Sequence, residues 1–321
     1  MKGFILAAGF GTRLWPLTED RTKPAIPFLN RPLIGYSVDY LTSFGINDII
    51  INLHHQPESI KQALSGSPPD TRIRYSFEET ILGTSGALDP VRDLLSDDDF
   101  VVINGKIVTN IDLAAVVEAH RRNNAIATLV LRKNSALEHF SIVEVDHKRW
   151  ITRFAGFPEQ SSEVAQAHSP PLMFTGIQVL SPRILDYVPS GIFSHSTIHV
   201  YPKAIEAGEA VMGYVSDGDW CEMSTLERYL DASLTFIRAQ GCSVVSGTGN
   251  SVASSAIVED SVLWDNVIVE ERARVRRAVL GDNVRIPAGS VIENAVVVRC
   301  EFVGDIERGE VVGDNLVVPL R

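Results

Sequence analysis

The sequence predicts an α/β protein in which residues 1–240 form a mixed, mostly parallel sheet with helices on both faces, and residues 241–321 form a solenoid of short strands. Short apolar runs alternate with helix-spaced apolar residues over residues 1–130, which is typical of strand–helix units on a parallel sheet. From about residue 245 a short motif recurs at a shift of 17 residues, which indicates stacked coils.

Individual elements follow from apolar runs and helical spacing. The expected strands are Gly3–Leu6, Asp48–Leu53, Asp99–Asn104 and Ala125–Leu131, with further strands around residues 140–146 and 174–180. The expected helices are Ile34–Phe44, Pro57–Leu64, Ser85–Leu95, Leu113–Arg122 and, leading into the second domain, Leu226–Gln240.

Composition limits the classes of partner. A chain of 321 residues has room for one or two domains with ample core. A net charge of −11 argues against nucleic acid, because phosphate backbones require clustered lysines and arginines. Cys221, Cys242 and Cys300 match no metal spacing and no disulfide framework, so a reducing cytoplasm is expected. We expect no signal peptide and no membrane span, because no run reaches 18 apolar residues.

The loop after the first strand is the strongest candidate for a binding site. It reads Leu6-Ala7-Ala8-Gly9-Phe10-Gly11-Thr12-Arg13, and Lys23 follows. Small residues leave main-chain N–H groups accessible, and ligands of parallel sheets bind at the carboxyl ends of strands. Arg13 offers a fork of donors and Lys23 a point charge, which together suit a nucleotide's phosphates. A glycine-rich turn with surface cations is the alternative interpretation.

The whole segment resembles the motif of the sugar-1-phosphate nucleotidylyltransferases, Leu-Ala-Ala-Gly-x-Gly-Thr-Arg-Leu-x-Pro-Leu-Thr followed by Pro-Lys-Pro, with Thr22 in place of that first proline. The resemblance covers essentially the whole chain and implies a Rossmann-like catalytic domain that joins an NTP to a sugar 1-phosphate and releases pyrophosphate. It implies catalytic roles for Arg13 and Lys23. It also implies nucleotide contacts by Leu6, Ala7, Ala8, Gly9, Gly11, Thr12 and Arg13.

A second segment, Glu79 to Leu88, contains Leu82-Gly83-Thr84-Ser85-Gly86. From the residues alone, Thr84 or Ser85 caps a helix and Gly86 lets a ligand lie close to the backbone. An ordinary capped helix explains the same residues. The resemblance implies that Glu79, Gly83, Thr84 and Gly86 contact the nucleobase. The sequence of this segment is most similar to that of the branch that makes GDP-mannose, which favours GTP.

The resemblance implies nucleotide contacts by the third segment, Asn104-Gly105-Lys106, which departs from the family pattern. The family has Asn-Gly-Asp there, and that aspartate binds Mg²⁺; the second family ligand falls on Glu222. A lysine about 4 Å from Mg²⁺ would cost on the order of 2 kcal/mol at water-like permittivity and about 8 kcal/mol at an effective constant of 20. Either Lys106 points away, or the metal lies elsewhere, or Lys106 itself neutralises the phosphates, or the site has decayed.

The sugar-binding half is expected over residues 140–182. The resemblance implies sugar contacts by Ser141, Glu144, Thr175 and Gly176. The family's Glu-Lys-Pro, whose Glu and Lys contact the sugar and its phosphate, is replaced by Gly156-Phe157-Pro158. Alternating core strands explain most of these residues without any ligand.

The repeat aligns Val262-Leu263-Trp264-Asp265-Asn266-Val267 with Val279-Leu280-Gly281-Asp282-Asn283-Val284, and a third copy begins at Val296. Each coil buries its apolar row against the next. The region resembles the left-handed parallel β-helix of hexapeptide-repeat proteins, whereas an ordinary β-sandwich is the alternative. We expect it to be structural, and to mediate self-association or to bind a regulator.

These observations predict a cytoplasmic enzyme that uses an NTP, with GTP favoured, and a sugar 1-phosphate. The alternative is a nucleotide-sugar-binding regulatory paralogue, because Lys106 replaces the metal-binding aspartate and the Glu-Lys pair is absent.

Overall fold

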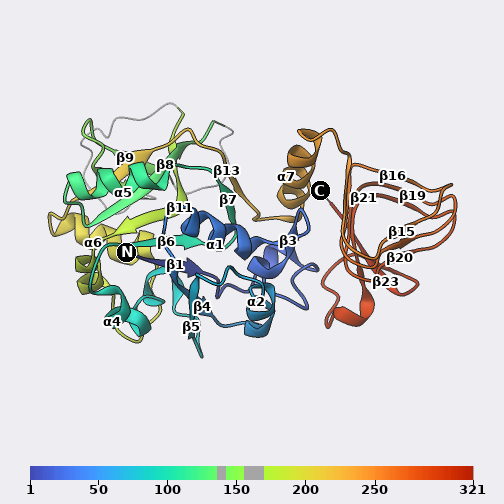
Figure 1. The fold of residues 1–321 in the computed structure, drawn as a ribbon, viewed down its shortest axis with the longest axis horizontal. Coiled ribbons are helices and arrows are strands. Elements are labelled where there is room, and N and C mark those ends of the chain that lie inside the picture. The colour runs from blue at the N-terminus through green and yellow to red at the C-terminus, as the bar shows by residue number, and fades with distance from the viewer. Residues whose placement is uncertain (136–141, 155–169, 321) are drawn as a thin grey trace. The chain divides into compact units, whose positions relative to one another are not determined.

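The computed structural model describes residues 1–135, 142–154 and 170–320 (Figure 1). The chain divides into two compact units. Unit 1 consists of Met1–Gly9, Ser37–His54 and Ser67–Trp220, and unit 2 consists of Phe10–Tyr36, His55–Gly66 and Cys221–Arg321. The glycine-rich loop is therefore divided after Gly9, so that the end of the first strand belongs to unit 1, and Arg13 and Lys23 belong to unit 2.

Unit 1 is built on one mixed sheet. Its strands are β1 (Lys2–Leu6), β4 (Asp48–Leu53), β5 (Arg72–Phe77), β6 (Phe100–Asn104), β8 (Ala127–Lys133), β9 (Ile142–Val145), β10 (Ile151–Phe154), β11 (Leu172–Leu180) and β12 (Val211–Val215). The order is β10-β9-β11-β6-β1-β4-β5, and β8 pairs with both β11 and β12. Pairing is parallel over β6-β1-β4-β5 and between β8 and β12, and antiparallel along β11 and between β9 and β10. The predicted mixed α/β sheet is confirmed, and its parallel pairs form two groups, β6-β1-β4-β5 and β8-β12.

The strand runs found in the sequence form the core of unit 1. Phe4, Ile50, Phe100, Val102 and Leu129 come from the three neighbouring strands β1, β4 and β6 and from β8, and all are fully buried in one cluster. A parallel strand covered on both faces needs apolar residues at successive positions, which explains why these segments read as continuous apolar runs.

The helices assigned wholly or partly to unit 1 are short. They are α1 (Leu33–Ser43), α3 (Gly83–Gly86), α4 (Arg92–Leu95), α5 (Leu113–Arg122) and α6 (Tyr201–Glu206), with one-turn segments η3 (Asp89–Val91), η4 (Pro182–Tyr187) and η5 (Ser196–Val200) and the short strand β7 (Ile107–Thr109). The single helix expected over Ser85–Leu95 is wrong: Pro90 lies in its middle, and a proline lacks the amide and the space that a continuous helix requires. The α5 helix is capped by Asp112, whose side chain accepts from Ala115 N.

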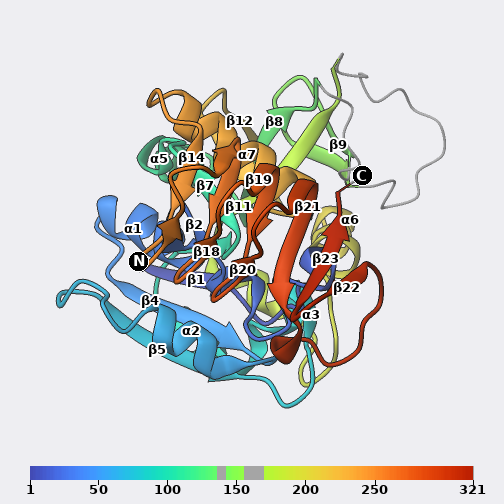
Figure 2. The ribbon, with the colours of Figure 1, turned by 90° about the vertical axis from the view of Figure 1, so that its right-hand side faces the viewer.

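Unit 2 contains the solenoid predicted from the repeat (Figure 2). Its elements are η1 (Thr12–Leu14), η2 (Lys23–Ala25), β2 (Pro27–Phe28), β3 (Arg31–Pro32), α2 (Pro57–Ala63), β13 (Trp220–Glu222, which begins at the last residue of unit 1), α7 (Leu226–Arg238), β14 (Val244–Ser246), β15 (Ser251–Val252), β16 (Ile257–Glu259), β17 (Ser261–Leu263), β18 (Ile268–Val269), β19 (Arg274–Leu280), β20 (Arg285–Ile286), β21 (Val291–Arg299), η6 (Cys300–Phe302), β22 (Glu310–Val312) and β23 (Asn315–Pro319).

The register of the solenoid follows the 17-residue period. Val245 pairs with Val262, Val262 with Val279 and Val279 with Val296, all in parallel strands. Figure 2 shows β19, β21 and β23 running side by side in this region. The apolar rows fill the interior of the coil, so the parallel coil is confirmed and the sandwich alternative is excluded; its left-handed winding stays a prediction.

Corner residues repeat with the strands. Asp260, Arg277 and Asn294 all have positive φ, and Asn266 and Asn283 do as well, each set spaced by 17 residues. Asparagine and aspartate tolerate this left-handed conformation better than other residues with a Cβ. The antiparallel strand β23 pairs with β21 and covers the last coil, which prevents an open parallel edge.

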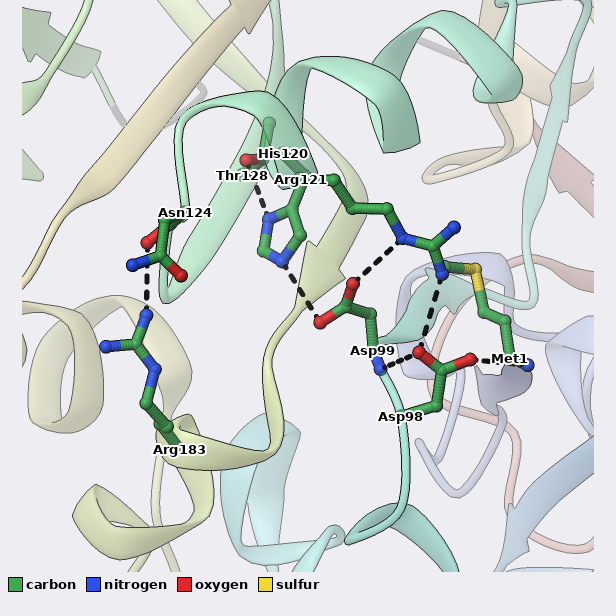
Figure 3. A network of polar contacts seen from close by, with 8 residues as sticks. All are labelled: Met1, Asp98, Asp99, His120, Arg121, Asn124, Thr128 and Arg183. Atoms are coloured by element: carbon green, nitrogen blue, oxygen red, sulfur yellow. Dashed lines mark hydrogen bonds and ion pairs between the residues drawn. The ribbon is translucent and has the colours of Figure 1, made fainter.

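A polar network joins the start of the sheet in unit 1 to the end of α5 (Figure 3). The amino group of Met1 lies 2.9 Å from Asp98 Oδ2, and Arg121 Nε lies 3.2 Å from Asp99 Oδ2. His120 is buried: its Nε2 lies 3.6 Å from Asp99 Oδ1, and its Nδ1 lies 2.9 Å from Thr128 Oγ1. Burial lowers the pKa of His120 below its ordinary value, against the opposing effect of Asp99.

The His120 site predicts an acid-sensitive fold. The unfolded chain takes up a proton near pH 6.5 and the folded chain resists it, so the free energy of unfolding should decrease as pH falls below that value, by up to about 1.4 kcal/mol per pH unit. His120→Gln should reduce this decrease. Denaturant unfolding at pH 7.5 and 5.5 measures it, with the exposed His147→Gln as control. An equal loss of stability in wild type and His120→Gln would contradict the assignment.

Candidate active site

The amide that follows β1 is used by the fold of unit 1. Leu6 pairs with Asn104 in the sheet, and the N–H of the buried Ala7 donates to Asn52 Oδ1 at 2.7 Å. The Ala7 N–H is therefore used within the fold, because a buried amide requires a partner and Asn52 supplies it. Contact between Ala7 and a nucleotide stays a prediction.

Asn52 extends this contact into a network. Its Nδ2 donates to Glu78 Oε1 at 2.7 Å, and Glu78 Oε2 accepts from Leu82 N at 2.8 Å. Asn52 and Glu78 are both 2% exposed. The network ties the ends of β1 and β4 to the start of α3. Sequence reasoning missed both residues, although a lone polar side chain near the end of the apolar run Asp48–Leu53 was an available signal.

Gly9, the last residue of the loop in unit 1, keeps open space around it. Within the part of the chain that the structure describes, no heavy atom outside Gly9 and its two chain neighbours lies within 4 Å of the position that a Cβ would take. Gly9 is exposed, whereas Ala7 and Ala8 are buried. The backbone at Gly9 can therefore be approached closely by a ligand.

The glycines of the second segment are explained by packing within unit 1. A Cβ on Gly83 would lie 2.5 Å from Ser194 O, and one on Gly86 would lie 2.8 Å from Ile192 O. Ser194 O also accepts from the amides of Ser85 and Gly86. The side of Gly86 that sequence reasoning left open for a ligand is thus occupied by the chain itself, and contact with a nucleobase stays a prediction.

Neither Thr84 nor Ser85 caps a helix, because α3 is one turn preceded by Leu82 with no side-chain cap. The Thr84 hydroxyl accepts instead from Ser196 N at 3.0 Å. Glu79 is exposed, whereas its neighbour Glu78 makes the buried contacts. The sequence analysis named Glu79, whereas Glu78 makes the hydrogen bonds that hold this segment.

Asn104 and Gly176 are brought together. Gly176 has φ +81°, and a Cβ on it would lie 2.2 Å from Asn104 Nδ2. Only glycine suits both the backbone conformation and this close approach. Gly105 N donates to Leu6 O at 3.0 Å, so the turn that carries the half-exposed Lys106 is fixed against the end of β1.

The predicted sugar-binding residues differ in their surroundings. The Thr175 hydroxyl is buried and donates to Val130 O at 2.8 Å, so it supports the sheet and presents no donor to a ligand. Glu144 Oε1 lies 3.5 Å from Arg153 Nη1, and Glu144 Oε2 is buried with no hydrogen-bond partner among the described residues. Ser141 and the Gly156-Phe157-Pro158 triplet lie outside the described residues.

Unit 2 holds the two predicted catalytic cations close in the chain. Gly11 has φ +74° and precedes η1, and a Cβ on it would lie 3.2 Å from both Lys23 Cβ and Thr18 Cγ2. Glycine suits this position because the backbone is left-handed and a Cβ would crowd Lys23. Thr12 and Arg13 are exposed, whereas Lys23 is 7% exposed.

Thr22, the departure from the family motif, has a structural partner. Its amide donates to Ser59 Oγ at 3.2 Å, and Ser59 Oγ donates to Gln56 O at 2.8 Å. Proline has no N–H to make this bond, so the substitution exchanges a rigid residue for a hydrogen bond to α2.

Among the described residues, no group of three or more His, Cys, Asp or Glu side chains could hold an ion. Glu222 is buried in β13, and Lys106 occupies the other position that the family uses. An ammonium is not a ligand, so this residue set does not fit Mg²⁺ held by two carboxylates.

Models of two known protein families match the chain. The model of the nucleotidyl transferases matches residues 2–238, and that of the GlmU-like C-terminal hexapeptide region matches residues 237–317. The chain belongs to the nucleotidyl transferase family, as an enzyme of its sugar-1-phosphate class that carries a C-terminal hexapeptide region.

Curated relatives carry two specificities in their names. A UTP–glucose-1-phosphate uridylyltransferase of Synechocystis is 28% identical, over 95% of this chain and 84% of its own length. A mannose-1-phosphate guanyltransferase of Yarrowia lipolytica is 29% identical, over 86% of this chain and 73% of its own. The corresponding guanylyltransferase of Mycobacterium tuberculosis is 26% identical, over 90% and 82%.

Solved structures show the same fold. HddC from Yersinia pseudotuberculosis, complexed with GMP-PN, superimposes with a TM-score of 0.60 at 21% identity, over 73% of this chain and 99% of that one. Within the described ranges 1–135, 142–154 and 170–320, no helix has both the length and the apolarity to cross a bilayer.

The contact between Asn104 and Gly176 predicts a specific coupling. Gly176→Ala should reduce the free energy of unfolding by more than the roughly 1–2 kcal/mol of left-handed strain, because the new methyl group meets Asn104. Asn104→Ala should recover the excess in the double variant, as denaturant unfolding would measure. Gly191→Ala, at φ +68° with open space, is the control for strain alone. Equal losses at 176 and 191, or simple additivity of the two changes, would contradict the contact.

Proposed function

We propose that this protein transfers a nucleotidyl group from GTP to mannose 1-phosphate or a closely related sugar 1-phosphate, and releases pyrophosphate. The observation that carries the proposal is the loop after β1, in which the open backbone at Gly9 is followed by the exposed Arg13 and by a Lys23 packed on Gly11. The coarser class, sugar-1-phosphate nucleotidyl transfer, follows from the family; the base and the sugar are the proposal.

In this mechanism a phosphate oxygen of the sugar attacks the α-phosphorus in line, and pyrophosphate leaves from the opposite side. Arg13 stabilises the leaving pyrophosphate through several donors, and Lys23 neutralises the charge that develops on the α-phosphate. No covalent nucleophile is required. Positioning and electrostatics provide the rate enhancement.

Glu144 is the described residue best suited to hold the sugar. Its buried Oε2 lacks a hydrogen-bond partner among the described residues, and a buried carboxylate oxygen is stabilised by a hydroxyl donor. Gly176 would contribute through its backbone beside Asn104. We leave Thr175 out of the proposed contacts because its proton is already donated to Val130 O.

Guanine is favoured by relatives from several organisms whose names specify mannose-1-phosphate guanylyl transfer. The relative from Synechocystis, of nearly equal identity, uses UTP and glucose 1-phosphate by its name, and makes that pair the competing substrate set. The segment Leu82–Gly86 supports guanine, because its amino-acid sequence is most similar to that of the branch that makes GDP-mannose.

In our proposal, the positive charge of the Lys106 ammonium group takes the place of a metal ion held by the protein. The family's dependence on Mg²⁺ rests on a carboxylate at this position, and the lysine here does not fit that role. We therefore assign no step to a protein-held metal; Lys106 holds phosphate oxygens as a point charge. Glu222 alone would contribute one hard oxygen ligand to a metal that arrives with the nucleotide.

The substrate assignment predicts that pyrophosphate release is fastest with GTP and mannose 1-phosphate. A coupled pyrophosphate assay over a panel of NTPs and hexose 1-phosphates measures kcat/KM for each pair. The UTP and glucose 1-phosphate pair should be at least tenfold slower. A preference for that pair would overturn the base and sugar, and no turnover with any pair, with or without Mg²⁺ or Mn²⁺, would overturn the proposed function.

Lys106 predicts an altered metal response. Lys106→Asp should make turnover depend on Mg²⁺ at lower concentrations than in wild type, because it restores a carboxylate at the family's ligand position. Lys106→Met should raise the KM for the NTP without changing the Mg²⁺ dependence, because it removes charge and adds no ligand. Identical Mg²⁺ titrations of wild type and Lys106→Asp would contradict the role assigned to Lys106.

A regulatory nucleotide-sugar-binding protein is the second candidate, favoured by Lys106 and by the absence of the Glu-Lys pair at 156–158. Calorimetric titration separates the two. Tight, metal-independent binding of GDP-mannose without turnover supports the regulator.

We further propose that residues 1–240 and 241–321 act as catalytic and β-helix domains, and that the β-helix associates with a second copy or with a regulatory partner. We also propose a reducing, cytoplasmic location, which the scattered positions of Cys221, Cys242 and Cys300 in the sequence support.

A further inference from the structure

A ladder of acidic side chains runs along one corner of the solenoid in unit 2. Thr248 N donates to Asp265 Oδ1 at 2.7 Å, and Asp265 N donates to Asp282 Oδ1 at 3.0 Å. The 17-residue period places these residues one above the other. Asp282 uses one oxygen in the ladder, and its other oxygen is directed at a residue far away in the sequence.

That residue is Arg21, in the N-terminal part of unit 2. Arg21 Nη2 donates to Asp282 Oδ2 at 2.6 Å, and the guanidinium also pairs with Asp20 through two bonds of 3.0 and 2.7 Å. Its Cζ lies 5.1 Å from the centre of the Trp264 ring, a cation–π distance. Burial acts to lower the pKa of Arg21, but Asp20 and Asp282 outweigh it and raise that pKa, so the charge is permanent.

Trp264 links this contact to a second one. Its indole N–H donates to Tyr229 Oη at 2.9 Å, and the Tyr229 hydroxyl donates to Pro27 O at 2.5 Å. Trp264 is 4% exposed and Tyr229 is fully buried. One aromatic side chain of the solenoid is therefore connected to both Arg21 and, through α7, to Pro27.

Arg21 and Pro27 bracket the segment that carries Lys23. Between them, Ala25 N donates to Thr22 O and Ile26 N to Lys23 O, which closes η2. Further contacts join residues 10–36 to the C-terminal part of unit 2: Asn30 Nδ2 to Ser246 O, Gly304 N to Glu19 Oε1 and Arg308 Nη2 to Trp15 O. The segment is held on both sides of Lys23 by residues of the solenoid and of α7.

We infer that Arg21, Trp264 and Tyr229 are positioning residues for Lys23, so that the solenoid sets the geometry of the lysine that neutralises the α-phosphate. This inference rests on the role that the proposed function gives to Lys23. It assigns the solenoid a part in the reaction beyond association of copies, and it does so through contacts that lie within one compact unit.

The test uses the full-length chain with Arg21→Met and Trp264→Phe. Arg21→Met removes the charge between Asp20, Asp282 and Trp264. Trp264→Phe keeps an aromatic face for Arg21 and removes the N–H that reaches Tyr229 together with part of the buried ring system. It leaves the charge of Arg21 in place and serves as the second variant if Arg21→Met unfolds the chain. Arg238→Met is the matched control, because Arg238 is the last residue of α7 and pairs with Asp260 of the solenoid at 2.9 Å in the same unit.

We expect a drop in kcat of about tenfold or more in Arg21→Met and a smaller drop in Trp264→Phe, with the KM for the NTP nearly unchanged, because a misplaced charge acts on the transition state. In a Lys23→Ala background, Arg21→Met should cause no further loss. Amide hydrogen exchange at residues 22–26 should accelerate in both variants and not in Arg238→Met.

Several outcomes would overturn the inference. It fails if exchange at residues 22–26 and kcat are both unchanged. It also fails if Arg21→Met lowers kcat by the same factor with and without Lys23, because Arg21 then acts independently of that lysine. A wild-type chain without turnover overturns the proposed function instead, and hydrogen exchange in the absence of substrate then decides whether the solenoid holds the segment.

Discussion

The buried hydrogen bond between Ala7 N and Asn52 is the constraint from which the rest of unit 1 follows. A strand that ends inside a protein leaves an amide without a sheet partner, and an unpaired buried amide costs on the order of 1–3 kcal/mol. Asn52 satisfies the amide and passes its own N–H to Glu78, which then fixes Leu82 at the start of α3. The ends of β1 and β4 and the turn after β5 are thereby held in one network. The loop after β1 becomes exposed only at Gly9.

The fold could be predicted because its signals are local. Continuous apolar runs such as Asp48–Leu53 mark strands covered on both faces, and the 17-residue shift between Val262 and Val279 appears unchanged as strand register. The error over Ser85–Leu95 had a local signal too, in Pro90, but helical spacing of the neighbouring leucines outweighed it. The antiparallel half of the sheet had no such signal, since β11 joins it through contacts distant in sequence.

The site was harder to predict, because a residue type does not reveal which of two physical requirements it meets. Gly86 lies in a segment whose sequence is typical of glycines that contact a ligand, yet the carbonyl of Ile192 fills the space beside it. Thr175 has a hydroxyl suited to a sugar, yet that hydroxyl is donated to Val130. Glu78 and Glu79 are adjacent and chemically equal, and only the direction of each side chain after the end of β5 separates the buried residue from the exposed one.

The solenoid illustrates a cost that any exact repeat incurs. A period that stacks identical residues also stacks identical charges, and two carboxylates one coil apart repel by about 1–3 kcal/mol at permittivities between that of water and that near a protein surface. At Asp265 and Asp282 this repulsion is offset by the hydrogen bonds that their side chains accept from backbone N–H groups, which complete the turn. The repulsion is relieved where the ladder meets a cation, and here that cation is Arg21 rather than a residue of the repeat. Because the relief comes from outside the repeat, the stability of the turn and the position of the N-terminal segment are coupled by electrostatics, without any ligand bound to the solenoid.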